Sequence, residues 1–221
     1  PMGVDIPSDD RPAVIELLGV ALKDCGMKMV QPRPTARIPI VQFVDPETEF
    51  ECDISFNNPL AMCNTSLLRA YSEVDPRVRP LAFIIKAWSR ARLMNSPGEG
   101  TLSSYGYILL LLHYLQTRSP AVVPNLQRLP PDWDGSYLPP GTKSRVQPQP
   151  DTYEMELNPV DGTPCKTYFY QPADEGMRRK LQAYGQNNKQ SVAELLVGFF
   201  KYYAYDFDFR ASVVSVQSGG P

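Results

Sequence analysis

The feature that most constrains the fold is a change of sequence pattern at Pro59. Upstream, three short runs rich in β-branched and aromatic residues are separated by proline and acidic turn residues, and they read "KMVQPR", "ARIPIVQF" and "EFECDISF". Such runs predict β-strands. Downstream, apolar residues recur at helical spacing in "PLAMCNTSLLRAYS", "DPRVRPLAFIIKAWSRARLMN" and "GTLSSYGYILLLLHYLQTR". We therefore predict an α+β chain, with a small α/β unit over residues 1–58 and a mostly helical unit over residues 59–221.

The remaining segments complete this outline. Residues 9–26 predict a helix, because two aspartates stand at its start and a glycine at its end. Residues 120–172 hold 11 of the 23 prolines, so we expect a long surface excursion, inserted at about residues 120–175. Residues 189–207 predict a further amphipathic helix, and residues 211–217 resemble a strand.

The charge is distributed unevenly along the chain. The formal net charge is −2, which does not indicate a protein that binds nucleic acid over its whole surface. Residues 69–92, however, carry six basic side chains against two acidic ones, and residues 28–37 carry three basic side chains and no acidic one. Two basic segments on an acidic background favour local sites for a polyanion.

Several features indicate an intracellular protein. No apolar run is long enough to cross a membrane, and no basic region followed by an apolar one marks a secretory signal. The four cysteines contain no C-x-x-C pair, which favours reduced structural thiols over disulfides or a zinc site. We therefore expect a cytoplasmic protein without contact to a membrane.

The helical pattern over residues 75–95 carries a row of cations. At 100° per residue, Arg79, Lys86 and Arg90 fall within an arc of about 40°, away from the apolar stripe. A solvated basic face is the ordinary explanation for such a row. Because the body of this helix carries no acid to pair with the cations, a site for phosphate groups is the alternative.

The segment "SPGEGTLSSYGY" leads into a nearly all-apolar helix. Thr101 or Ser103 can cap that helix, whose first turn has free backbone N–H groups suited to an anion. Ser104 and Tyr105 lie in this turn, and the tyrosine ring can stack on a base. Alternatively, the serines are only caps and the tyrosines only packing residues. His113, further along, is expected to be a core residue.

Asp53 lies in a strand-like stretch, between Cys52 and Ile54. A carboxylate among apolar residues is costly unless it is paired or bound to a metal. Pairing with an arginine and ligation of a divalent ion are both compatible with the pattern. The metal explanation requires further carboxylates nearby, because a lone aspartate holds Mg²⁺ poorly.

Six blocks in order carry a resemblance to a known family. "ARIPIVQF", "CDISFNN", "LAMCNTSLLRAY", "DPRVRPLAFIIKAW", "GTLSSYGYILLLLHYL" and "ELLVGFFKYYAYDF" resemble the successive motifs of the noncanonical terminal nucleotidyltransferases, which include terminal uridylyltransferases and cytoplasmic poly(A) polymerase-like enzymes. The resemblance runs from about Asp9 to Val216. It implies a partial nucleotidyltransferase palm with a mixed sheet over residues 1–58. It also implies a helical central domain, the poly(A) polymerase-associated domain, over residues 59–221.

The resemblance also implies an activity and its residues. The activity is template-independent addition of ribonucleotides to RNA 3′ ends with two Mg²⁺ or Mn²⁺ ions, most characteristically UMP from UTP, with ATP and CTP as other substrates. The implied metal-binding and catalytic carboxylates are Asp53 and Asp5. The implied nucleotide site consists of six side chains, Asn64, Thr65, Lys86, Arg90, Ser104 and Tyr105. The candidates for RNA contacts are Arg33, Arg37, Asn57 and Asn58.

The N-terminal region departs from the family pattern. The family places a Gly-Ser pair and an Asp-x-Asp strand before the first helix, whereas this chain has only "PMGVDIPSDD" there, with Gly3 where the first aspartate belongs. The chain also stops at "VVSVQSGGP", before the closing block that the family usually has, so the resemblance implies a domain that is incomplete at both ends. Two hypotheses follow: a monomeric enzyme that acts on RNA 3′ ends and nucleoside triphosphates, or a catalytically inactive relative that serves as an RNA- or protein-binding scaffold.

Overall fold

The computed structural model describes residues 10–137, 155–158 and 160–217. The chain divides into two compact units. The first comprises residues 1–63 and 155–166, and the second comprises residues 64–154 and 167–221. Both helices and strands are present, so the predicted α+β class is confirmed.

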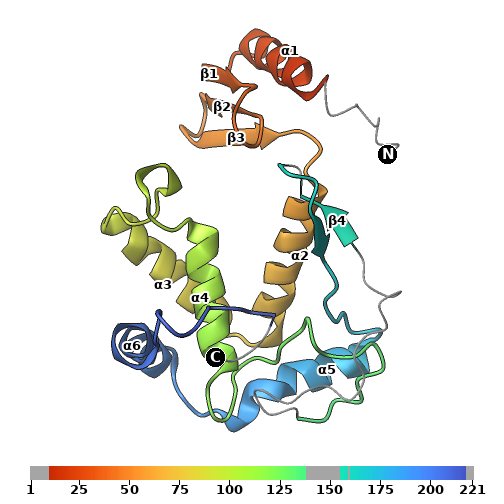
Figure 1. The fold of residues 1–221 in the computed structure, drawn as a ribbon, viewed down its shortest axis with the longest axis vertical. Coiled ribbons are helices and arrows are strands. Elements are labelled where there is room, and N and C mark those ends of the chain that lie inside the picture. The colour runs from red at the N-terminus through yellow and green to blue at the C-terminus, as the bar shows by residue number, and fades with distance from the viewer. Residues whose placement is uncertain (1–9, 138–154, 159, 218–221) are drawn as a thin grey trace. The chain divides into compact units, whose positions relative to one another are not determined.

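The first unit contains one helix and a small sheet (Figure 1). The helix is α1 (Arg11–Asp24), and the strands are β1 (Lys28–Arg33), β2 (Ile40–Val44) and β3 (Glu51–Ser55). The strands pair antiparallel in the order β1-β2-β3. A hairpin of β4 (Met155–Leu157) and β5 (Pro164–Lys166) belongs to the same unit.

Helix α1 packs against β1 through its two buried residues, Ile15 and Gly19. A Cβ atom at Gly19 would lie 2.4 Å from Cγ of Pro32, so only glycine allows the strand to approach this closely. The helix ends where Gly26 adopts a φ of 81°, a left-handed conformation that costs glycine least. Asp10 occupies the N-cap position as predicted, although its side chain makes no capping hydrogen bond.

The second unit is built around α4 (Ser104–Gln116). It also contains α3 (Val78–Ala91), α5 (Glu175–Ala183), α6 (Val192–Lys201) and the part of α2 (Pro59–Val74) from Asn64 onward. Short 3₁₀ turns cover Pro97–Glu99 and Tyr184–Asn187, and a π-helical turn, Tyr202–Asp206, follows α6. Helix α4 contributes seven buried residues, which confirms the central position predicted from its all-round apolar character.

Aromatic side chains join these helices. The ring of Trp88 on α3 meets Tyr107 of α4 and Phe200 of α6, with centroids 6.1 Å and 4.7 Å away. Tyr114 of α4 contacts Phe199 of α6 edge to face at 5.9 Å. Each such pair adds about 1 kcal/mol to the burial of its apolar area, so α3, α4 and α6 form one core.

The C-terminal half differs from the sequence-based expectation at three points. Residues 121–129 do not lie on the surface, because Val122, Val123 and Leu126 are fully buried. Helix α5 was not predicted, since its mean apolar character is low. Residues 211–217 form no strand; they are held instead by hydrogen bonds to the side chains of His113 and Asn125. The prolines at 139–150 lie outside the described residues.

Gly198 provides a test of this core. A Cβ atom there would lie 2.1 Å from the hydroxyl oxygen of Tyr114. Gly198→Ala must therefore displace the Tyr114 ring, and we expect a loss of about 1–3 kcal/mol in the free energy of unfolding despite the better helix propensity of alanine. Gly98→Ala is the control, because a Cβ there meets nothing within 4 Å. Equal denaturation midpoints for the two variants would contradict this packing.

Candidate functional site

The cations predicted on one face of α3 are all exposed. Arg79, Lys86 and Arg90 lie on the side of α3 opposite the buried Leu81 and Ile85. Among the described residues, no ion pair involves any of the three. Their charges are therefore not neutralised within the described protein, which favours a site for anions over an internal ion-pair network.

A cavity of about 310 Å³ lies between α2, α3 and α4. Two residues of the predicted nucleotide site, Thr65 and Lys86, line it together. Of the described residues that line it, three are cations, Arg69, Arg79 and Lys86, and none is acidic. Its apolar floor is lined by Leu68, Val78, Ala82, Phe83, Ile108 and Leu112. The cavity, which we call the α2–α3 cavity, thus combines apolar surface with positive charge, as a nucleotide requires.

The start of α4 has the predicted helix-terminal geometry. Ser103 is the cap, because its Oγ accepts a hydrogen bond of 3.1 Å from the backbone N–H of Gly106. Thr101 has another role: its hydroxyl joins both backbone groups of Ser96. Ser104 and Tyr105 are half-buried in the first turn, and burial raises the pKa of the Tyr105 phenol. Tyr105 is therefore a neutral ring at physiological pH, suited to stacking.

Asp53 is exposed, whereas its apolar neighbours in the sequence suggested a charge within the core of a sheet. On β3 the exposed residues alternate with half-buried ones, and Asp53 is exposed opposite Gln42 while Cys52 and Ile54 point to the other face. Because the strand has a period of two, the carboxylate avoids the apolar side. Within the described ranges no group of three His, Cys, Asp or Glu residues could hold a metal ion, and Asp5 lies outside them. The described residues therefore do not by themselves fit a divalent ion.

The four candidates for RNA contacts belong to the first unit. Asn58 caps α2, since its Oδ1 accepts from the backbone N–H of Ala61 at 3.2 Å. Asn57 is exposed and has a φ of 48°, which asparagine tolerates better than most residues. Arg33 and Arg37 are exposed, and the charge of Arg37 contributes to lowering the pKa of Asp161 on the β4–β5 hairpin, where hydrogen bonds within the turn to Thr163 are the main cause.

His113 is a fully buried core residue, as predicted. Its Nδ1 lies 3.2 Å from the backbone carbonyl oxygen of Ser215, and its ring packs edge to face against Phe207. Burial lowers the pKa of the imidazole below its ordinary value, opposed by the hydrogen bond to Ser215. The ring is therefore held neutral, in a position that serves packing.

This lowered pKa predicts a pH dependence of stability. In the unfolded chain the histidine takes up a proton near pH 6.5, whereas in the folded protein it does so only at a lower pH. The free energy of unfolding is therefore highest above about pH 6.5 and decreases as the pH falls from there toward the lowered pKa of the folded state. His113 is the only histidine of the chain. His113→Gln should therefore flatten the slope of unfolding free energy between about pH 7.5 and pH 5.5, measured by urea denaturation. The same slope in both proteins would contradict the assignment.

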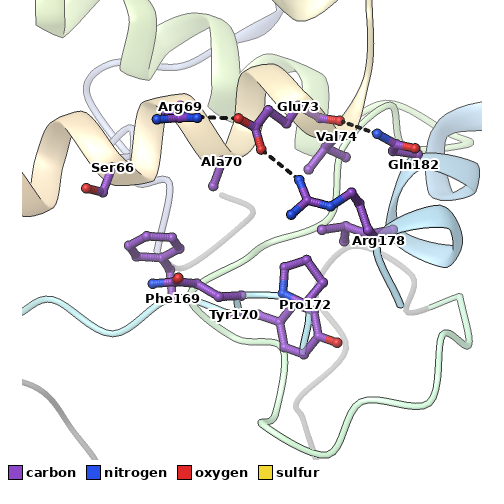
Figure 2. A pocket seen from close by; sticks show the side chains of 12 residues that line it. Ser66, Arg69, Ala70, Glu73, Val74, Phe169, Tyr170, Pro172, Arg178 and Gln182 are labelled. Carbon is purple, nitrogen blue, oxygen red and sulfur yellow. Dashed lines mark hydrogen bonds and ion pairs between the residues drawn. The ribbon is translucent and has the colours of Figure 1, made fainter. Parts of the chain in front are cut away.

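A second cavity, of about 360 Å³, lies on another side of α2 (Figure 2). Helix α2, helix α5 and the segment 169–172 form its walls. Sequence reasoning missed it because its residues come from segments about 100 positions apart, and α5 was not predicted. The one available signal was the arginine pair in "MRRK". We call this the α2–α5 pocket.

Parts of the chain match two protein-family models, and most of the chain matches curated proteins. Residues 7–73 match the family model of the central palm domain of mitochondrial-like poly(A) RNA polymerase, and residues 191–221 match that of the Cid1 family of poly(A) polymerases. Poly(A) RNA polymerase cid11 of Schizosaccharomyces pombe is 34% identical over 91% of this chain and 35% of its own length. Human terminal uridylyltransferase 7 is also 34% identical over 91% of this chain, but over 12% of its own length.

The fold agrees with these sequence matches. The structure of Cid1 in complex with its short product ApU superimposes with a TM-score of 0.67 at 30% identity, covering 95% of this chain and 57% of that one. The chain belongs to the noncanonical terminal nucleotidyltransferases, the family of these poly(A) and poly(U) polymerases and terminal uridylyltransferases. It spans about a third or less of the length of the two curated relatives.

No described helix is both long and apolar enough to span a membrane. The four cysteines are free thiols, as predicted, although Cys25 is exposed and so is not a core residue.

Proposed function

We propose that this chain is the nucleotide-binding part of an enzyme that adds ribonucleotides to RNA 3′ ends without a template. The single observation that carries the proposal is the α2–α3 cavity, which Thr65 and Lys86 line together with two further exposed cations, Arg69 and Arg79. The names of its relatives, poly(A) polymerase and terminal uridylyltransferase, support the reaction class. Residues 1–58 would act as a partial palm and residues 59–221 as the helical domain.

Each residue has a proposed role in this reaction. Lys86 and Arg90 bind the triphosphate, and their charges offset the negative charge that develops on the leaving pyrophosphate. Ser104 adds a phosphate contact at the start of α4, where backbone N–H groups favour anions. Tyr105 stacks on the base. Asn64 and Thr65 contact the ribose and the adjoining phosphate.

Asp53 is the proposed catalytic carboxylate, exposed on β3. When bound, a divalent ion, Mg²⁺ or Mn²⁺, would supply charge neutralisation and activation of the attacking 3′-hydroxyl. Asp53 alone offers too few ligands for such an ion, so its binding requires carboxylates beyond the described residues, with Asp5 as the proposed second. Arg33, Arg37, Asn57 and Asn58 are the proposed RNA contacts of the palm.

We propose UTP as the preferred substrate, with ATP and CTP as weaker ones. All three bases stack on a tyrosine, and the relatives include both poly(A) polymerases and uridylyltransferases at the same 34% identity. The identity level does not separate the two nucleotides, and the superposition on Cid1, a poly(U) polymerase, supports UTP. We further propose a monomeric, cytoplasmic protein whose partners are an RNA 3′ end and a nucleoside triphosphate.

The second candidate function is an inactive scaffold that binds RNA or protein. The observation that favours it is the lack of a three-ligand metal cluster among the described residues. Retention of Lys86 together with Thr65 in one positively charged cavity favours the enzyme, since a scaffold has no need of a triphosphate site.

Titration with nucleotide tests the proposed site. Using the full-length protein, we expect Lys86→Ala to weaken UTP binding about tenfold or more, because one charge-assisted contact contributes about 1.5–3 kcal/mol. Lys23→Ala, at the last turn of α1, is the matched control and should bind UTP as the unmodified protein does. Equal UTP affinities for the two variants would contradict the assignment of Lys86 and the α2–α3 cavity to nucleotide binding.

A further inference from the structure

The α2–α5 pocket has the chemistry of a nucleic-acid subsite. Figure 2 shows Phe169 and Pro172 along one wall, across from Glu73 of α2 and Arg178 of α5. Phe169 is half-buried, so its ring packs on the core and still reaches the pocket. Aromatic rings offer a stacking surface to any base, and guanidinium groups bind phosphates or stack in turn.

The charges of the pocket leave binding capacity for an anion. Glu73 accepts from Nε of Arg69 at 3.0 Å and from an Nη atom of Arg178 at 3.2 Å. Hydrogen bonding by Arg69, with the charges of both arginines, lowers the pKa of Glu73, so it is ionised at neutral pH. Among the residues that line the pocket, two guanidinium groups stand against one carboxylate, while Glu175, which also pairs with Arg178, lies outside the lining. An arginine has five N–H donors, and Arg178 uses few of them on Glu73 and Glu175.

Polar groups able to read a base edge also line the pocket. Gln182 donates its amide N–H to the backbone carbonyl of Glu73 at 3.3 Å, and this bond does not use the lone pairs of its own side-chain oxygen. Gln171 of the segment 169–172 and Ser66 of α2 also line the pocket. Amide groups of this kind both donate and accept, as base edges require.

Arg69 connects this pocket to the proposed nucleotide site. It lines both the α2–α3 cavity and the α2–α5 pocket, and it lies on α2 between Thr65 and Glu73. Thr65 and Glu73 are eight helical steps apart, a rise of about 12 Å. Stacked nucleotides repeat at about 3.4 Å along a strand, so a strand that starts at Thr65 reaches the α2–α5 pocket after about three or four nucleotides.

We propose that the α2–α5 pocket binds one nucleotide of the substrate RNA, upstream of its 3′ end, with the base on Phe169 and the phosphate on Arg178. This inference rests on the proposed function, because it takes the strand's 3′ end to lie at the nucleotide site. The aromatic wall and the continuity with the proposed nucleotide site through Arg69 favour single-stranded RNA over an acidic peptide as the ligand.

Binding of oligoadenylates of two to eight nucleotides to the full-length protein tests the proposal, with fluorescence anisotropy as the readout. We expect the affinity to rise about tenfold between the trimer and the hexamer. Phe169→Ala should reduce the hexamer-to-trimer affinity ratio to near one. Arg178→Gln should also lower this affinity ratio. In a plot of log affinity against log salt concentration, it should reduce the slope for the hexamer by about 0.7, the value for one phosphate contact on a single strand.

Arg179→Gln is the matched control, because Arg179 neighbours Arg178, is 78% exposed and does not line the pocket. It should leave the affinity ratio unchanged. Thermal unfolding of each variant shows whether a loss of RNA binding is due to a loss of folding. If Phe169→Ala does not fold, Arg178→Gln still tests the proposal. An unchanged ratio in both folded pocket variants overturns the proposal, as does an affinity for polyglutamate equal to that for the hexamer.

These outcomes are distinguishable from failure of the proposed function. Extension of RNA by the unmodified protein, together with an affinity ratio that the pocket variants do not change, overturns the subsite alone. A protein that extends no RNA with any nucleotide overturns the proposed function, and a length-dependent affinity that still requires Phe169 then supports the subsite in a scaffold.

Discussion

Replacing Asp53 by alanine is expected to lower the rate of nucleotide addition by about a thousandfold while nucleotide binding remains measurable. The expected size follows from the several kcal/mol that a catalytic carboxylate and its ion contribute to phosphoryl transfer. Binding should persist because the proposed triphosphate contacts, Lys86 and Arg90, are on α3 and not on β3. Extension of a labelled oligo-A RNA and titration with UTP measure the two effects separately.

The exposure of Asp53 makes this result interpretable. An exposed strand residue that takes part in no ion pair among the described residues contributes little to stability. Asp53→Asn, which keeps the shape and removes the charge, should lose the same activity. Glu51→Ala on the same strand and the same exposed face is the control. Unchanged addition by Asp53→Ala would refute the catalytic assignment.

Replacing Arg77 by alanine is expected to cost about 3 kcal/mol or more in the free energy of unfolding. Arg77 forms a two-point ion pair with Asp75, at 2.9 Å and 2.7 Å, and these side chains are 16% and 5% exposed. Its remaining donors bind the backbone carbonyls of Gly185, Asn188 and Gln190. Removing Arg77 leaves a buried, uncompensated carboxylate and takes a donor from three carbonyls, of which that of Gly185 still accepts from the backbone N–H of Asn188.

The position of Arg77 explains why its loss should destabilise more of the protein than the turn that contains it. The turn between α2 and α3 is joined through it to residues 185–190, directly before Ser191, whose capping box starts α6. For a chain of this size, 3 kcal/mol corresponds to a fall in melting temperature of about 10 °C. Arg179→Ala is the control, since its pair with Glu175 is mostly exposed, and it should shift the temperature by about 2 °C or less. Equal shifts in melting temperature for the two variants would contradict the proposed role of Arg77.

The sequence predicted those elements whose pattern is local. Strands β1 to β3 and helices α2, α3 and α4 lie where period-two and helical spacing put them, because each buries one face or, for α4, nearly every face. The row of Arg79, Lys86 and Arg90 followed from helix geometry alone. The cap by Ser103 was one of two predicted alternatives, and the backbone of Ser96 decides between them by engaging Thr101.

Features that depend on tertiary contacts could not be predicted. Prolines at 120, 124 and 130 suggested a surface segment, yet Val122, Val123 and Leu126 between them fill the core. Helix α5 has few apolar residues, and its start depends on Asp174 accepting from the N–H of Met177 at 2.8 Å. The α2–α5 pocket joins residues about 100 positions apart, for which periodicity carries no information.

The orientation of Asp53 shows the limit of pattern analysis most clearly. The alternation of residues 50–56 predicted a strand with one apolar face. Asp53 is an odd position between the even positions of Cys52 and Ile54, so the period of two places it on the opposite face. An expectation of burial followed only from its apolar neighbours in sequence. In the structure those neighbours point away, and the carboxylate is free to act on a ligand.

Extension of a labelled oligo-A RNA by the full-length protein, with each of the four ribonucleoside triphosphates and Mg²⁺, tests the central claim most directly. We predict addition of nucleotides to the 3′ end, fastest with UTP, and loss of that addition in Asp53→Ala. No extension with any nucleotide, by a folded protein whose RNA binding is intact, would contradict the enzyme and leave the scaffold.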